Sequence, residues 1–594
     1  GDSYKFRASS YYKLTPDLGM AVTGYYTHTG GFFENLATGD KCDWERLGGG
    51  RWKTQWRNRT GLRIDNTLSF SVLEQGGYPY AYVGDDIIGD DGRPVVRRGE
   101  IRYNDPCSYR RTALSDGLTI RYDAGSFTVA SITCYQYSDD EMILDQDFLP
   151  LSYFTLRQAR TEHSVTEDLV FRSRGDKAYR WLLGAFGFYR HGTMNAPVHF
   201  KQTGIEELIL KYANENDQSY RYSWGLKDGT GGDELFLGSD FRMPSAGGAL
   251  YHESNYTLGR WRFTAGLRFD FEHARLRYRN YTDTWYTKTR IKDDAVYELQ
   301  LEIDDRSTLK QTFTELLPKF SVMYSFDETR NLYLTIAKGY KSGGFNTQIF
   351  SDVLQQKMMN RMGIGEVYDV QRGVAYKPEY SWNYEIGGHF SCMEGAVRGD
   401  FALFYIDCRD QQLTVFPPGQ TTGRMMTNAG RTRSLGAEAA VQISPWRTFD
   451  INLAYGYTDA RFVRYETTVK NDDGDPVRIS YKDNRIPYAP QHTLSAGAAW
   501  TVPTGVKWLG DLVFQAGVRC AGRIWWNEEN TLSQPFYALT DASVRFEHAR
   551  YSLSVWGRNL ADAGYDVFYF KSIGNEFVQR GRPRTFGITL NINL

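Results

Sequence analysis

Short and long connections alternate strictly along this 594-residue chain. Each short connection is a polar turn between two strand-like segments, and each long one is a polar or aromatic insertion. A soluble β-sandwich has no reason to sort its connections in this way, whereas a membrane barrel with brief turns on one side and long loops on the other does so directly. The short turns fall at 14–17, 57–60, 123–126, 174–176, 259–260, 327–330, 393–395, 444–447, 503–505 and 547–549. The clearest long insertions are 76–108, 192–245, 278–308, 342–378 and 463–487.

Apolar and polar side chains alternate within the strand-like segments. The final stretch, 585–594, alternates without a slip, and around Phe269 the charged Arg268, Asp270 and Glu272 lie on the face opposite the apolar one. This period of two is that of a β-strand with one face in an apolar phase and the other in water. A single such strand also suits a soluble sandwich, so the prediction depends on how often the pattern recurs.

The composition favours an all-β chain. Aromatic residues make up 15% of it, with 42 Tyr, and Gly (58) far exceeds Pro (18). The net charge of −1 excludes a global basic field for nucleic acid. The mean hydropathy is −0.52, and no run of about 18 apolar residues occurs, which excludes a helical membrane span. A barrel stays compatible with these values because only alternate residues face lipid.

The turns and insertions predict about 21 strands. The first strand begins on the long-loop side and the last one ends on the short-turn side. A closed antiparallel bacterial barrel has an even number of strands, with both ends on one side. We therefore expect one strand to be missing before Gly1, because an open edge in hydrocarbon leaves backbone groups unpaired at a cost of several kcal/mol each. A miscounted hairpin is the alternative.

Six segments carry a more specific signal. They are LPKF at 317–320, LYLTIAKGYKSGGFN at 332–346, KPEYSWNYEIG at 377–387, ALFYID at 402–407, GRNLAD at 557–562 and GRPRTFG at 581–587. In this order and spacing the chain resembles, over most of its length, the C-terminal barrel of TonB-dependent outer-membrane transporters of the iron-complex receptor type. The resemblance implies an all-β transmembrane barrel of the 22-strand type with a plugged lumen, in which residues 1–594 form one outer-membrane barrel domain.

The sequence departs from that family in two ways. The family ends in an aromatic residue, whereas this chain ends in Leu594. The family's N-terminal plug, with the segment that contacts TonB, has no counterpart here, and the likeness starts at what resembles the second barrel strand. We expect the plug and the first strand to come from another polypeptide or fragment. The resemblance implies further partners: TonB–ExbB–ExbD acting through the plug, outer-membrane lipid, the barrel-assembly machinery and, for a glycan or peptide cargo, a surface lipoprotein.

The resemblance implies import rather than catalysis, and no GxSxG, Walker, HExxH or dinucleotide motif is present. The favoured cargo is a ferric siderophore or a similar metal chelate. A planar, anionic chelate can stack on Tyr or Trp and pair with Arg, and binding residues concentrate on long loops. The candidates are Tyr78, Tyr80, Tyr82, Arg97, Arg98, Trp525, Trp526, Phe568, Tyr569 and Phe570. For each ring, a place in the aromatic girdles of the membrane interfaces is the alternative.

The sequence also suggests roles for three further groups of residues. We expect the lumenal Arg268, Asp270 and Glu272 to pack against the plug rather than to touch the cargo. Cys42 and Cys107 fall on neighbouring external loops, where a disulfide would persist, so they are a candidate pair, with two free thiols as the alternative. The acidic runs 85–92 and 471–475 offer oxygen ligands for calcium but lack EF-hand spacing, and solvated loops are the alternative. We expect no resident metal or cofactor.

Two other classes of function stay open at this point. One is a passive porin that never holds a plug. The other is a surface barrel that binds a protein, glycan, haem or cobalamin ligand. Histidine side chains could ligate haem iron, but those of this chain lack the motif pair of haem receptors. The alternative is that they are scattered surface residues; they are His163, His191, His199 and His252.

Overall fold

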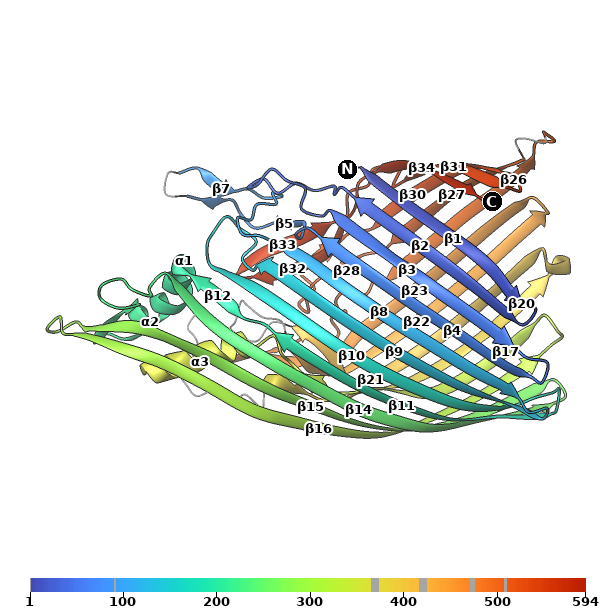
Figure 1. The fold of residues 1–594 in the computed structure, drawn as a ribbon, viewed down its shortest axis with the longest axis horizontal. Coiled ribbons are helices and arrows are strands. Elements are labelled where there is room, and N and C mark those ends of the chain that lie inside the picture. Colours follow the sequence, from blue (N-terminus) through green and yellow to red (C-terminus); the bar gives the residue numbers. More distant parts are fainter. Residues whose placement is uncertain are drawn as a thin grey trace.

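The computed structural model describes residues 2–89, 92–364, 373–415, 425–470, 476–506 and 510–593. Most of them belong to one antiparallel sheet that curves into a cylinder (Figure 1). Twenty-one strands form its wall, each paired with the next wall strand along the chain. They are β1 (Ser3–Thr15), β2 (Leu18–Thr29), β3 (Glu45–Arg57), β4 (Leu62–Gln75), β8 (Ser108–Asp123), β9 (Phe127–Asp145), β10 (Phe154–Ser173), β11 (Tyr179–Asn195), β14 (Glu234–Leu258), β15 (Trp261–Arg290), β16 (Val296–Ser325), β17 (Asn331–Lys341), β20 (Glu379–Cys392), β21 (Val397–Val415), β22 (Met425–Trp446), β23 (Phe449–Arg464), β26 (His492–Pro503), β27 (Asp511–Ala521), β30 (Tyr537–Glu547), β31 (Tyr551–Arg558) and β34 (Thr585–Ile592).

The two ends of the cylinder differ as the connection lengths predict. All ten predicted short turns join consecutive wall strands and lie at one end, on the right in Figure 1. The long insertions, together with every helix of four residues or more in the described chain, lie at the other end. The prediction of an antiparallel transmembrane barrel with about 21 strands is confirmed.

Each wall strand has an apolar outer face and a more polar inner face. In β15, Leu267, Phe269 and Phe271 are 45 to 48% exposed, while the intervening Arg268 and Asp270 are half-buried. In β34, the apolar Phe586, Ile588, Leu590 and Ile592 are 58 to 71% exposed. The exposed apolar side chains therefore form an outer belt that suits contact with lipid.

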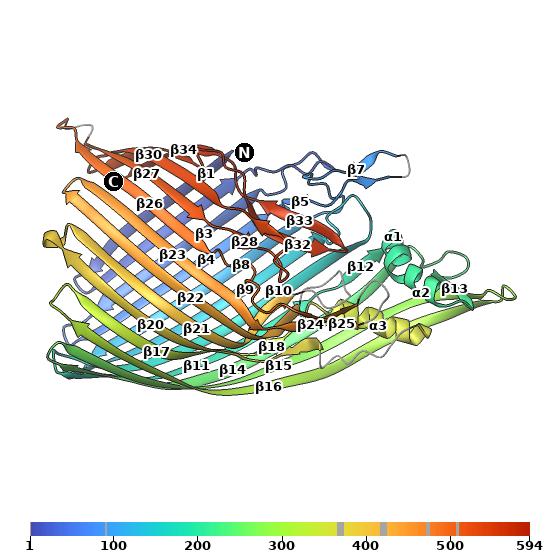
Figure 2. The ribbon, with the colours of Figure 1, turned by 180° about the vertical axis from the view of Figure 1, so that it is seen from behind.

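The wall has two open edges within the part of the chain that the structure describes. Strand β1 pairs with β2 and β34 pairs with β31, and neither has a second neighbour. All thirteen residues of β1 are exposed. Both edge strands run along the same side of the cylinder in the two opposite views of Figures 1 and 2. A row of backbone donors and acceptors thus stays available on each edge.

Smaller elements cover the loop end. None of the described helices is long and apolar enough to cross a membrane. The elements are β5 (Tyr80–Tyr82), β6 (Ile87–Ile88), β7 (Pro94–Val96), β12 (Val198–Lys201), α1 (Gln202–Gly204), the π-helix η1 (Ile205–Leu210), α2 (Lys211–Asn216), β13 (Tyr220–Trp224), β18 (Gly344–Phe345), α3 (Phe350–Met362), β19 (Ala375–Tyr376), β24 (Glu466–Lys470), β25 (Pro476–Ser480), β28 (Ile524–Trp525), β29 (Ser533–Gln534), β32 (Asp566–Ser572) and β33 (Asn575–Arg580); the 3-10 turn η2 (Met393–Gly395) lies at the opposite end.

One of the predicted long insertions has a different structure from the one expected. The stretch 278–308 is no irregular loop, because β15 and β16 continue through it as a hairpin of two 30-residue strands. Its Tyr, Thr and Trp residues favour extended backbone, so the hairpin projects beyond the rest of the wall, as Figure 2 shows. The projection carries β13 and packs against α3, and it forms one side of the loop end.

Candidate ligand-binding pocket

A cavity of about 560 Å³ opens among the loop-end elements. It is lined by the loop-side parts of β9, β10 and β11, by β12 and α3, by β32, and by the segment that leads into β5. The lining residues come from six separate regions of the chain, 78–80, 142–158, 194–208, 239, 347–359 and 568–572, which the wall brings to one end.

Aromatic side chains form one side of the cavity. The rings of Tyr78 and Tyr80 stack with centroids 5.5 Å apart, and Tyr80 meets Phe570 edge-on at 4.6 Å. Phe148 meets Tyr80 edge-on at 5.0 Å, and Phe568 stacks on Phe570 at 5.6 Å. Offset and edge-on contacts are the favoured arrangements of aromatic rings. Burial raises the pKa of the Tyr78 phenol, so this hydroxyl stays neutral.

A small sheet fixes this aromatic side. Strands β5, β33 and β32 pair in that order, with Tyr82 opposite Phe577. The sheet joins the 76–107 loop to the last loop, nearly five hundred residues away in the sequence. Tyr82, Phe570 and Phe577 belong to one buried apolar cluster beneath it, and so the rings are held from both loops.

The cavity also has polar lining residues, nearly all of them uncharged. Helix α3 contributes Ser351, Gln355 and Gln356, and its other face buries Leu354 and Met358 in the largest apolar cluster of the loop end. Further amides and hydroxyls come from elsewhere around the rim. They are Gln146, Gln158, Ser239, Thr347, Gln348 and Ser572. The charged side chains that line the cavity are Asp352 and Lys571.

The structure brings four of the predicted ligand residues together and separates the other six. Tyr78, Tyr80, Phe568 and Phe570 line the cavity. The other six do not line it. Tyr82, Tyr569 and Trp526 are buried in the apolar clusters behind it, Trp525 lies under the guanidinium of Arg523, and Arg97 and Arg98 are exposed on the loop that follows β7.

Two parts of the cavity are absent from the sequence-based expectations. One is α3, whose buried Phe350, Leu354, Met358 and Met362 recur at helical spacing, a signal that could have identified it. The other is Phe148, in the connection between β9 and β10. This residue has a positive φ of 53°, and nothing in its local sequence indicates that its ring enters a cavity.

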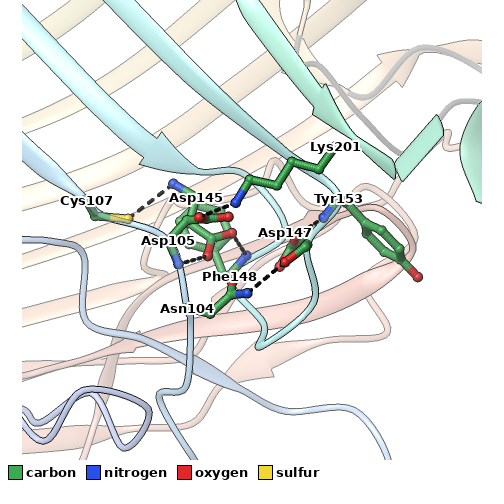
Figure 3. Close-up of polar contacts among 9 residues, drawn as sticks. Asn104, Asp105, Cys107, Asp145, Asp147, Phe148, Tyr153 and Lys201 are labelled. Carbon is green, nitrogen blue, oxygen red and sulfur yellow. Dashed lines mark hydrogen bonds and ion pairs between the residues drawn. The ribbon is translucent and has the colours of Figure 1, made fainter. Parts of the chain in front are cut away.

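Two buried carboxyl groups hold the turn that carries Phe148 (Figure 3). Asp145 accepts hydrogen bonds from the backbone N–H groups of Phe148 at 3.2 Å and Asp105 at 3.0 Å. Asp147 accepts from those of Leu149 at 2.8 Å and Tyr153 at 3.2 Å. Neither aspartate is exposed to solvent. The turn is therefore fixed by side-chain acceptors rather than by a sheet.

The same two carboxyl groups influence each other's protonation. Burial raises the pKa of Asp147 well above its usual range, and the neighbouring charge of Asp145 raises it further. Lys201 forms an ion pair with Asp105, and the Cys107 thiol accepts a hydrogen bond from the backbone N–H of Asp145 at 3.2 Å. The pair itself has no cation beside it among these contacts, so at neutral pH one of the two acids stays protonated.

The predicted lumenal residues form a network on the inner face of the wall. The guanidinium of Arg268 binds the carboxylate of Asp270 at 2.8 Å and lies over the ring of Tyr251, whose hydroxyl donates to Asp168 at 2.6 Å. Glu272 lies on the same face and is half-buried. The contact of these residues with a plug stays a prediction.

Cys42 and Cys107 are free thiols in the structure. They pack in one apolar cluster around Tyr103, and the Cys42 thiol donates to the carbonyl of Phe33 at 3.6 Å. Burial raises the pKa of both thiols to about 12. Their disulfide stays a prediction, which intact mass before and after reduction and alkylation will test.

The two acidic runs predicted as candidate calcium ligands lie partly outside the described residues. Asp90, Asp91 and residues 471–475 lie outside the described residues. Among the residues that are described, no three His, Cys, Asp or Glu side chains come together to hold a metal ion.

This wall defines the class of outer-membrane β-barrel proteins. Residues 2–560 match the family described as TonB dependent receptor-like, beta-barrel, so the chain belongs to the TonB-dependent receptor family. It is 26% identical over 287 residues to the pesticin receptor of Yersinia enterocolitica, an alignment that covers 48% of this chain and 37% of that receptor. It is 25% identical over 292 residues to the ferrioxamine receptor of the same species, which covers 48% of this chain and 34% of that receptor. The aligned parts thus amount to little more than a third of these relatives' length.

The fold agrees with solved structures of receptors. The ferric yersiniabactin uptake receptor of Yersinia pestis superposes with a TM-score of 0.72 at 18% identity, covering 100% of this chain and 78% of that one. The siderophore receptor of Acinetobacter baumannii gives a TM-score of 0.68 at 13% identity, covering 99% of this chain and 79% of that one. The chain is therefore an outer-membrane β-barrel protein of this family.

Proposed function

We propose that this chain forms the wall and outer binding pocket of a TonB-dependent importer, and that its cargo is a ferric siderophore or a similar metal chelate. The observation that carries the proposal is the cavity at the loop end, which is lined by five aromatic rings from three loops and by polar residues of α3. The names of the ferrioxamine receptor and of the ferric yersiniabactin uptake receptor support a cargo of this class. The family and its similar structures are receptors, so the proposal contains no catalytic step.

Uptake by intact cells tests this proposal. Cells that carry the protein should accumulate radioactive iron supplied as a siderophore complex, and accumulation should fall to the background level when TonB is deleted or the proton gradient is collapsed. Equal uptake with and without TonB would instead indicate a passive channel and would overturn the proposal.

We further propose that one β-strand seats between β1 and β34 and that a plug fills the lumen, where it contacts Arg268, Asp270 and Glu272. TonB–ExbB–ExbD acts through the plug. The open edges and the full exposure of β1 support this arrangement. An edge of this kind in hydrocarbon costs several kcal/mol for each unpaired backbone group.

Site-specific cross-linking should detect the seated strand. A photo-reactive amino acid in place of Tyr11, which is 78% exposed on β1, should cross-link in native membranes to a segment that belongs to neither β2 nor β34. The same amino acid at Tyr26 on β2, inside the paired wall, is the control and should show no such product. A direct cross-link from position 11 to β34 would mean that these strands close the wall alone.

A further inference from the structure

We propose that the pocket selects chelates without net negative charge, namely neutral or weakly cationic iron complexes with apolar or aromatic faces and with amide or hydroxyl groups on their surface. This inference rests on the proposed function and specifies its cargo. It differs from the sequence-based expectation of an anionic chelate paired with arginine, because the structure places those arginines elsewhere.

The charged side chains that line the cavity support this inference. No arginine or histidine lines it, and Lys571 is its one lining cation within the described residues. The ammonium group of Lys571 forms an ion pair with the carboxylate of Glu576 at 2.9 Å. Asp352 adds a carboxyl group that is only 8% exposed. An anionic chelate that enters would therefore lose its hydration and meet no spare positive charge in return.

Three other cations near the cavity also form ion pairs with carboxylates. Lys357, on α3, forms an ion pair with Asp305 of β16. Lys201 of β12 pairs with Asp105, next to the turn that carries Phe148. Arg157 of β10 pairs with Glu141 of β9. Each of these three cations is thus matched by a carboxylate.

The polar groups that do line the cavity suit a neutral ligand. Five glutamines reach it, from the loop end of β9, from β10, and from α3 with its leading segment. A glutamine amide both donates and accepts, so it pairs with amide, hydroxamate or hydroxyl groups without a charge. The glutamines line the cavity together with the aromatic rings, and the Ser572 hydroxyl, beside these rings on β32, donates to the carbonyl of Gln146 at 2.6 Å. Three methionines, Met142, Met194 and Met359, complete an adaptable apolar lining.

Binding of two probes of opposite character tests the inference on the purified protein. The probes are a neutral ferric trihydroxamate and a trianionic ferric tris-catecholate, each titrated in detergent at physiological salt by calorimetry. We expect the neutral complex to bind at least about tenfold more tightly, with little dependence on salt. Tighter binding of the trianionic complex would overturn the inference and leave the proposed function intact. If neither probe bound, the proposed function would fail together with the inference.

A charge introduced on α3 should shift this preference. Gln356→Lys places an ammonium group in the lining and should raise the affinity for the tris-catecholate relative to the trihydroxamate by about tenfold. Gln356→Glu should shift the ratio in the opposite direction. Gln202→Lys adds the same charge at an exposed position outside the lining and should leave the ratio unchanged. Equal ratios for Gln356→Lys and Gln202→Lys would contradict the proposed role of the lining charge.

Discussion

The variant Tyr80→Ala/Phe570→Ala is expected to bind a ferric chelate about 100-fold more weakly than the wild type. Tyr80 contacts Phe148 and Phe570 and faces the cavity together with them. Loss of one aromatic contact surface costs about 1 to 2 kcal/mol, and 1.4 kcal/mol is a factor of about ten in affinity. The dissociation constant from calorimetric titration with a neutral ferric trihydroxamate measures the effect.

Two controls separate loss of the binding surface from loss of the fold. Trp525→Ala removes a ring of the same loop end that lies outside the cavity, so the dissociation constant should stay within about twofold of the wild type. Tyr80→Phe keeps the ring and should bind nearly as well. A double variant with wild-type affinity and an unchanged melting temperature would show that the aromatic side of this cavity is not where the chelate binds.

Substitution of Asp147 is expected to have the second large effect. Asp147→Ala removes the acceptor of two backbone hydrogen bonds and leaves the N–H groups of Leu149 and Tyr153 buried without a partner, at a cost of about 1 to 3 kcal/mol for each. Hydrogen exchange of these two amides should therefore accelerate by tenfold or more. The turn that places Phe148 in the cavity loosens with them, so the affinity for the chelate should also fall.

The isosteric Asp147→Asn gives the pH test. An asparagine does not titrate; its single amide oxygen can accept one of the two backbone hydrogen bonds, while its NH2 group replaces the other acceptor oxygen. The raised pKa means that the folded turn keeps a proton that the unfolded chain releases near pH 4. Stability of the turn should thus be fully present at acid pH and decline as pH rises above 4 towards the raised pKa.

Hydrogen exchange between pH 5 and 9, corrected for intrinsic rates, measures this dependence. In the wild type the protection of Leu149 and Tyr153 should fall with pH, whereas in Asp147→Asn it should change little. Protection that is equally independent of pH in both proteins would contradict the raised pKa of Asp147.

The wall was predictable from the sequence because each strand and each short turn shows its pattern within its own few residues. A strand that separates lipid from water shows its period of two in every segment, and the turns of one end are short for the same reason throughout. The ten turns and the count of about 21 strands follow from that rule alone. Even the projecting hairpin of β15 and β16 has a strand-like composition, and only its polar character made 278–308 look like a loop.

The pocket was predictable only in part, since its geometry depends on contacts between distant segments. Aromatic composition identified Tyr80 and Phe570, but the pairing of β5 with β33, which decides that Tyr82 faces away, joins residues nearly five hundred positions apart. The glutamines of α3 carry no signal as ligands by themselves. Arg97 looked suitable by residue type, yet its loop directs it to solvent.

The structure of the purified protein with a neutral ferric trihydroxamate bound, determined by cryo-electron microscopy, tests the central claim most directly. If the chelate binds in this cavity, density for the metal complex will lie between the rings of Tyr80 and Phe570 and the amides of α3. Density for the chelate elsewhere on the protein, with this cavity empty at a saturating concentration, would contradict that claim.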